Sequence, residues 1–261
     1  MIKLREEELK LIYRKKRGIL VKDSGTYYFK EAFEDGIELI VERLAKLVGI
    51  KCAHYEFLNI KGKRFYLSQM IANEDKFYTL EDLDFNERNL TELRNSLNTF
   101  YPKYVDYIME QIIKIYLFDI IILNPDRRGA NIGIYYQKDE RPDIYIFDNE
   151  EAFYKGSSTY YVARDVIIPL LARNFLFNTK VVSNSNVEDL LFFIKEYGEE
   201  YFELFKKMLE ILTPDVVSDI ISSIEKEEKR EFYMKEVYLE TYVSNYNKIC
   251  EVLENNLGKT I

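Results

Sequence analysis

The chain has 261 residues, of which 47% are hydrophobic and 31% are charged, a composition typical of a globular protein with a sizeable core. Acidic residues outnumber basic ones by 45 to 37, a formal net charge of −8, so there is no strong signal for binding nucleic acid or an anionic membrane over the whole surface. Two distant cysteines, Cys52 and Cys250, make no disulfide framework. A single histidine, His54, argues against hydrolase schemes built on a Ser-His or Cys-His pair.

No segment has the composition of a leader or a membrane anchor. The N-terminal residues are charged and no apolar stretch follows them, unlike in a signal peptide. The most apolar segment, Tyr104 to Leu123, contains four charged side chains, so it predicts a buried helix rather than a transmembrane segment. Together with the low cysteine content, these features predict a cytoplasmic protein.

The first part of the chain, residues 1–72, predicts a small β-rich lobe with one helix. Gly18 to Phe33 has strand-forming residues on both sides of an Asp-Ser-Gly turn, which predicts a hairpin. His54 to Ile60 and Arg64 to Ile71 predict a second hairpin around a Lys-Gly-Lys turn. Between them, Gly36 to Val48 has apolar residues at helical spacing and is followed by a glycine, which predicts a helix and its end.

Residues 73–78 predict a connecting hinge, and residues 79–261 predict a larger, mostly helical lobe. One strand pair, Asn131 to Tyr136 with Asp143 to Phe147, interrupts the helices. The sequence therefore predicts an α+β fold of two lobes. The helices expected in the second lobe share apolar residues at helical spacing, and they are Asn86 to Thr99, Lys103 to Leu123, Arg164 to Phe177, Val187 to Tyr197, Tyr201 to Leu212, Pro214 to Ile224 and Lys229 to Leu257.

Three polar residues around the predicted strand pair have the chemistry of Mg-assisted phosphoryl transfer. Asp126 lies in a loop after a buried helix, and Asn131 follows five residues later. Asp148 ends the apolar strand that follows. An acid in the loop could orient or deprotonate an attacking hydroxyl, while the amide and the second acid could hold metal ions that bridge ATP phosphates. Each residue alone could be a loop acid, a turn residue or a strand terminator, but all three together favour phosphoryl transfer.

The predicted first lobe contains a lysine and a pair of acids that fit the same chemistry. Lys30 lies near the end of a strand and could bind nucleotide phosphates. Glu38 and Glu42 lie one turn apart on the following helix, where either could hold the lysine in place. Without the acids of the second lobe, these residues would be interpreted as an exposed lysine and a solvated helix face.

The segment Asn124 to Ile134, together with Phe147-Asp-Asn149, resembles the HipA-like kinases and the related phosphoinositide kinases. Those families share an N-x-D-R-H-x-x-N phrase followed by an acid after a strand, on a two-lobed protein-kinase-like fold. Asp148 to Phe153 is especially similar to the ending found in type II phosphatidylinositol 4-kinases, and Glu38 to Ile50 resembles the HipA-like helix that contains the lysine's glutamate partner. Tyr66 to Ile71 resembles the strand that leads into the hinge.

The resemblance implies ATP and Mg²⁺ as cofactors and a role for each candidate residue. Asp126 would be the catalytic acid or base, Asn131 and Asp148 the metal ligands, Lys30 the phosphate-binding lysine and Glu38 its partner. The remaining nucleotide-binding positions would be Ser24 and Gly25 over the phosphates, and Gln69, Met70 and Ile71 at the adenine.

The resemblance also implies a protein substrate with a Ser or Thr hydroxyl and an antitoxin or regulatory protein as a partner. The loop Ser157 to Tyr161 would occupy the activation-segment position, where a hydroxyl is a candidate for self-phosphorylation. The sequence departs from the family in Arg128, which replaces the usual histidine, and in the absence of a G-x-G-x-x-G loop. A lipid kinase, an adenylyltransferase on the same fold and a pseudokinase that only binds a partner are alternatives that the sequence leaves open.

Overall fold

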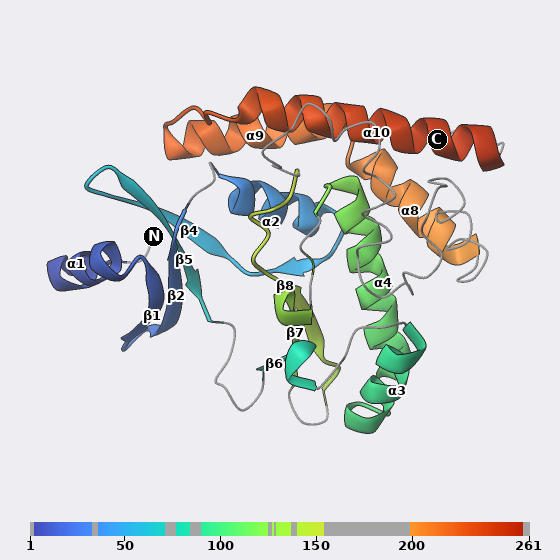
Figure 1. The fold of residues 1–261 in the computed structure, drawn as a ribbon, viewed down its shortest axis with the longest axis horizontal. Helices are drawn as coiled ribbons and strands as arrows, with labels where there is room; N and C mark the ends of the chain where they lie inside the picture. The colour runs from blue at the N-terminus through green and yellow to red at the C-terminus, as the bar shows by residue number, and fades with distance from the viewer. Residues whose placement is uncertain are drawn as a thin grey trace.

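The computed structural model describes residues 3–32, 36–70, 77–83, 90–124, 127, 129–136, 140–153 and 199–257. Its helices are α1 (Glu6–Lys15), α2 (Ile37–Leu47), α3 (Leu90–Phe100), α4 (Val105–Ile121), α8 (Glu199–Ile211), α9 (Pro214–Glu228) and α10 (Lys235–Leu257), with short 3-10 turns at η2 (Glu81–Leu83) and η3 (Gly129–Asn131) (Figure 1). Its strands are β1 (Arg17–Lys22), β2 (Gly25–Glu31), β3 (Lys51–Cys52), β4 (Tyr55–Ile60), β5 (Lys63–Gln69), β6 (Phe77–Thr79), β7 (Ile132–Tyr135) and β8 (Asp143–Ile146).

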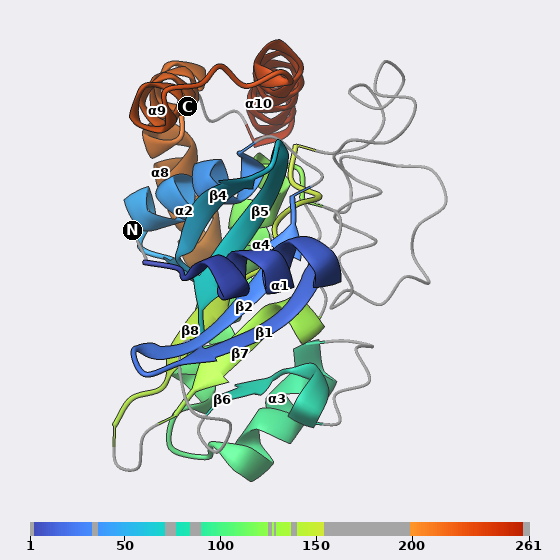
Figure 2. The same cartoon turned by 90° about the vertical axis from the view of Figure 1, so that its left-hand side faces the viewer.

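The first sheet is antiparallel, has the strand order β1-β2-β5-β4, and contains both hairpins predicted from the sequence. The β4–β5 turn includes Gly62 at φ +80°, a conformation that glycine adopts without strain. Helix α1 lies across this sheet in Figure 2, and its Ile12 joins Phe29 and Phe65 in a small apolar core. Helix α1 was not predicted from the sequence, because its three consecutive glutamates and basic end hide a narrow apolar stripe.

The second sheet has the order β3-β8-β7-β6 and joins segments that are far apart in the chain. The predicted strand pair is present as antiparallel β7 and β8, while β3 runs parallel to β8 and β6 pairs with β7. The two outer strands were not predicted, because strands of two and three residues have no measurable alternation. Strand β6 overlaps the predicted hinge at residues 77–78, and residues 73–76 lie outside the described residues.

Helix α2 has its apolar side buried at helical spacing, with Ile37, Ile40, Val41 and Leu44 inaccessible to solvent. Glu38 lies on the same helix and is also fully buried, so its carboxylate must find partners inside the protein. The large apolar core continues from α2 through α4 to α8, α9 and α10. No helix in the described ranges is long and apolar enough to cross a membrane.

The last two helices lie side by side above α2 in Figures 1 and 2. The connection between α9 and α10 approaches the start of α2 so closely that a Cβ atom on Gly36 would lie 2.2 Å from the Phe232 ring. We expected the last helix to begin at Lys229, but it begins at Lys235. Lys229 has φ +52° and ends α9, and the Phe232 N–H donates to Glu225 Oε1 at 2.7 Å. The helices predicted at residues 164–177 and 187–197 lie outside the described residues.

Candidate active site

Lys30 lies near the end of β2 with its side chain inside the protein and only 4% exposed. Its Nζ atom is 2.8 Å from Glu38 Oε1, 2.5 Å from Asp148 Oδ1 and 3.0 Å from Glu150 Oε2. Burial alone would lower the pKa of this lysine, but the three nearby carboxylates outweigh burial and raise the pKa above its usual value. Lys30 is therefore held as a cation, and it joins residues from both sheets and α2.

Glu38 makes contacts with both of its carboxylate oxygens. Oε1 accepts from Lys30, while Oε2 accepts from the backbone N–H of Asn149 at 3.0 Å and from its side-chain Nδ2 at 3.1 Å. Glu42, the other glutamate weighed as the partner of Lys30, instead contacts His54 Nδ1 at 2.6 Å and the Tyr55 N–H at 3.1 Å. The helix thus presents Glu38, rather than Glu42, to the lysine.

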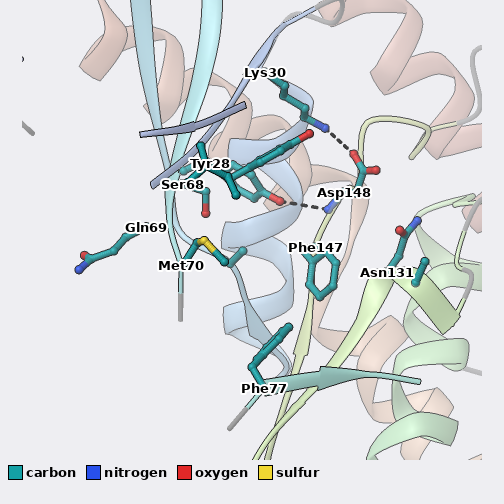
Figure 3. A pocket seen from close by; sticks show the side chains of 13 residues that line it. Tyr28, Lys30, Ser68, Gln69, Met70, Phe77, Asn131, Phe147 and Asp148 are labelled. Carbon is teal, nitrogen blue, oxygen red and sulfur yellow. Dashed lines mark hydrogen bonds and ion pairs between the residues drawn. The ribbon is translucent and has the colours of Figure 1, made fainter. Parts of the chain in front are cut away.

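Asp148 lies two residues after the end of β8 and has φ +56°, a left-handed conformation that is unfavourable for a residue with a Cβ atom. Its N–H donates to the Tyr55 hydroxyl at 3.0 Å, and its side chain turns toward Lys30 (Figure 3). Left-handed backbone at non-glycine residues is concentrated at functional sites, where the surrounding structure holds it in place. This conformation is what aims a carboxylate from the end of β8 back at the first sheet.

A cavity of about 420 Å³ lies between the two sheets, within the usual size range of small-molecule sites. Five of the candidate residues line it, and Figure 3 shows Asp148 and Asn131 close to each other, across the cavity from Met70. Gln69 also lines the cavity, although its side chain extends away from Asp148 (Figure 3). The full lining is Ile19, Tyr28, Lys30, Ala53, Tyr55, Ser68, Gln69, Met70, Phe77, Ala130, Asn131, Phe147 and Asp148.

The other candidate residues are placed as follows. Ser24 and Gly25 lie in and beside the β1–β2 turn and are not among the described residues that line this cavity. The Tyr27 hydroxyl donates to Ser24 Oγ at 3.1 Å, and a Cβ atom on Gly25 would lie 3.0 Å from Gln69 Nε2. Asp126 and Ile71 lie outside the described residues, as does the loop at residues 157–161.

Arg127, for which no role was predicted from the sequence, is fully buried. Its guanidinium forms two hydrogen bonds with the Asp119 carboxylate, Nε to Oδ2 at 2.9 Å and Nη2 to Oδ1 at 3.1 Å. It also donates to the backbone carbonyls of Asn131 at 3.2 Å and Phe147 at 3.1 Å, and to Asn149 Oδ1 at 2.5 Å. The one sequence signal for Arg127 was its place after Asp126 in the N-x-D-R motif. That motif lies in a charged segment with the composition of a loop, which does not indicate that the arginine is buried.

The Arg127–Asp119 pair satisfies the conditions under which two charges are tolerated in a protein interior. Burial raises the pKa of Asp119 above its usual value, and the guanidinium and the Asn124 amide oppose this rise by favouring the charged form. For Arg127, burial lowers the pKa, but Asp119 outweighs burial and raises it. The remaining guanidinium protons are also bonded. Because both side chains are buried, removal of either partner would leave an uncompensated buried charge.

The described residues include no cluster of three or more His, Cys, Asp or Glu side chains suited to a metal ion. Asn131 and Asp148 instead offer one amide oxygen and one carboxylate next to the same cavity. That pair fits Mg²⁺, which prefers oxygen ligands and is commonly held by only one or two protein groups together with water and substrate phosphates. An all-protein cage is not required for that metal.

No protein-family model matches the sequence, and none of the curated proteins matches it. Solved structures do match the fold. The Helicobacter pylori proinflammatory kinase CtkA has a TM-score of 0.58 and 14% sequence identity, over 90% of this chain and 90% of that chain. The HipA toxin of Shewanella oneidensis MR-1, solved in complex with HipB and operator DNA, has a TM-score of 0.55 and 13% identity, over 89% of this chain and 58% of that chain.

These similarities confirm the predicted α+β, protein-kinase-like fold and the resemblance to the HipA-like kinases, at the level of the fold. At 13–14% identity they do not carry over a substrate or a residue's role.

Proposed function

We propose that this chain is an ATP- and Mg²⁺-dependent serine/threonine protein kinase of the HipA-like type. The observation that carries the proposal is the meeting of Lys30, Glu38 and Asp148 at one edge of the cavity, with Asn131 beside them. A lysine held by a helix glutamate, next to an amide and a carboxylate that can bind metal, is the arrangement that phosphoryl transfer from ATP requires. The kinase-like fold around the cavity supports the same assignment.

In this proposal each residue has a specific task. Lys30 binds the phosphates and is kept in place by Glu38, while Asn131 and Asp148 bind the metal. A bound Mg²⁺ would neutralise charge on the transferred phosphoryl group. Asp126 orients the substrate hydroxyl and accepts its proton, as its position in the chain between α4 and Asn131 suggests.

The apolar part of the cavity suits the base of the nucleotide. Ala53, Phe77 and Phe147 supply apolar surface, and Gln69 at the end of β5 lines the same cavity together with Met70. We propose that backbone groups at Gln69, Met70 and Ile71 contact adenine, with Met70 acting through its carbonyl because its N–H donates to the Thr26 carbonyl at 2.8 Å, and that the turn at Ser24 and Gly25 covers the phosphates. These assignments place the reactive phosphate toward Lys30 and Asp148.

We propose a protein hydroxyl as the acceptor and the cytoplasm as the location. The Shewanella HipA was solved with HipB, which supports the proposal that this chain also has an antitoxin or regulatory partner. Ser157, Ser158 and Thr159 are the proposed sites of self-phosphorylation. No contact among the described residues favours a lipid acceptor, adenylyl transfer or a catalytically inactive binding module, so these alternatives enter as outcomes of the experiment.

The test is to incubate the purified protein with Mg-ATP and follow its intact mass, alongside Asp148→Asn and Asp126→Asn. Each variant should lose phosphoryl transfer by about 10²- to 10³-fold, because a group that stabilises or aligns the transition state is lost. Asp126→Asn should retain ATP binding, since its task is at the acceptor. Asp106→Asn is the matched control, because it makes the same chemical change on a side chain that is 86% exposed on α4.

The outcomes separate the alternatives. Mass gains of one phosphate in the wild type and in Asp106→Asn, but not in the other two variants, support a self-phosphorylating kinase. A gain of AMP would identify an adenylyltransferase. If there is no gain, added protein and phosphoinositide substrates distinguish a kinase that acts only on other molecules from an inactive one. Absence of ATP binding in the wild type would contradict the proposed function.

A further inference from the structure

Asn149 lies between the two buried ion pairs and touches both. Its Oδ1 atom accepts from Arg127 Nη2 at 2.5 Å, and its Nδ2 atom donates to Glu38 Oε2 at 3.1 Å. Its backbone N–H donates to the same Glu38 oxygen at 3.0 Å. The residue is fully buried, so these contacts form away from water.

The chemistry at this position requires an amide. Oδ1 faces a guanidinium, which only donates, and Nδ2 faces a carboxylate, which only accepts. Aspartate at position 149 would present an acceptor to Glu38 where a donor is needed, and leucine of similar size would satisfy neither neighbour. An amide hydrogen-bonded to two charged groups makes stronger contacts than one between neutral groups.

Arg127 connects the same amide to the segments that carry the proposed metal ligands. It donates to the carbonyl of Asn131 itself and to that of Phe147, the residue before Asp148. The contacts therefore run from Lys30 to Glu38, on to Asn149 and Arg127, and then to both metal-binding segments. They connect β2 and α2 with the start of β7 and the end of β8.

We propose that Asn149, held by Arg127, is a positioning residue that fixes the phosphate-binding lysine relative to the two metal ligands. The inference rests on the proposed function and deepens it, because it makes the lysine site and the metal site a single unit. ATP phosphates that contact Lys30 and a bound Mg²⁺ together would need both sites at the correct separation, and a displacement of about 1 Å can cost about 10²-fold in rate. Adenosine has no phosphates and does not need that separation.

The test compares ATP and adenosine binding, each with Mg²⁺, in the wild type and in Asn149→Leu. ATP affinity should fall by about 10- to 100-fold, the effect of losing hydrogen bonds to charged groups. Adenosine affinity should change by less than about threefold, since the apolar part of the cavity is untouched. The ratio of the two affinities is a readout that a general loss of stability does not change.

Asn245→Leu is the matched control. Asn245 is 1% exposed on α10, and its Nδ2 donates to the carbonyls of Ile120 at 3.0 Å and Ile121 at 2.9 Å, so the same substitution also breaks buried hydrogen bonds. It is not among the described residues that line the cavity, and its ratio of ATP to adenosine affinity should match that of the wild type.

Two results would overturn the inference. One is a folded Asn149→Leu protein with the wild-type ratio of ATP affinity to adenosine affinity. The other is a fall in this ratio in Asn245→Leu as large as the fall in Asn149→Leu. If Asn149→Leu does not fold, Asn149→Asp keeps the size and the acceptor for Arg127, and the same loss is expected of it. A wild type that binds ATP no better than adenosine would instead contradict the proposed function, so the two failures can be told apart.

Discussion

Lys30 and Arg127 are two buried cations that lie close to the same cavity, but their surroundings differ. Lys30 faces three carboxylates, those of Glu38, Asp148 and Glu150. Arg127 faces a single carboxylate, that of Asp119, and its other donors bond to neutral oxygens. One cluster has an excess of two negative charges, and the other is neutral.

The Lys30 cluster and the Arg127 cluster also differ in their exposure to solvent. The Arg127 and Asp119 side chains are both 0% exposed, whereas the Asp148 side chain is 35% exposed and that of Glu150 is 25% exposed. The neutral, closed cluster is complete without a ligand. The negative, open cluster is suited to receive a divalent cation. The comparison teaches that burial of a charge does not by itself indicate function, whereas an uncompensated charge at a cavity does.

The largest expected effect is on stability, from Arg127→Met. The substitution leaves Asp119 buried without its counter-charge, and the free energy of unfolding should fall by about 3–5 kcal/mol. Denaturant unfolding of the purified protein measures this. Arg94→Met is the control, because the Arg94–Asp106 pair is exposed and should contribute less than about 1 kcal/mol. Equal losses in the two variants would contradict the distinction between the closed cluster and the surface.

Lys30→Met should reduce activity strongly and stability less. Phosphoryl transfer should fall by about 10²- to 10³-fold, because the group that binds the phosphates is lost. The free energy of unfolding should fall by less than it does in Arg127→Met, since two of the three carboxylates around Lys30 are partly open to water. Activity assays and unfolding curves on the same samples measure both. A large stability loss with retained transfer would reverse our assignment of the two cations.

The smallest effect is expected for Glu150→Gln. Glu150 contacts Lys30 Nζ at 3.0 Å and is partly exposed, so the contact should contribute at most about 1 kcal/mol. Its removal frees a position on the lysine, and ATP affinity should rise by up to about fivefold. Equilibrium titration measures the change. A fall in affinity would show instead that Glu150 assists binding, for example as a further metal ligand.

Most of the fold could be predicted because its signals are local. The hairpins of the first sheet have turn residues between strand-forming runs, and α2 and α4 have clear apolar patterns. Strands β3 and β6 could not be predicted, since their pairing with β8 and β7 comes from residues distant in the chain. The late start of α10 depends on the conformation of Lys229 and a contact with Glu225, neither of which has a sequence signature.

The candidate site also contains residues that could be predicted from the sequence and residues that could not. Lys30 and Glu38 could be paired from the order of strand and helix and from the family resemblance, and the structure brings them together. Arg127 and Asn149 were part of the quoted segments, but no pattern along the chain indicates that an arginine in a charged loop is fully buried. Arg127 precedes β7 and bonds to Asp119 on α4, while Asn149 follows β8 and bonds to Glu38 on α2, and these contacts join residues distant in the chain. Asp126 lies outside the described residues, and its role stays a prediction.

The central claim, that the open negative cluster is a metal–nucleotide site, is tested most directly by titrating ATP into the wild type and Asp148→Asn, each with and without Mg²⁺. We predict that Mg²⁺ raises the affinity of the wild type for ATP by at least about tenfold, equivalent to about 1.4 kcal/mol, and that Asp148→Asn loses most of this gain. Equal ATP affinity with and without Mg²⁺ in the wild type, or the same gain in the variant, would contradict it.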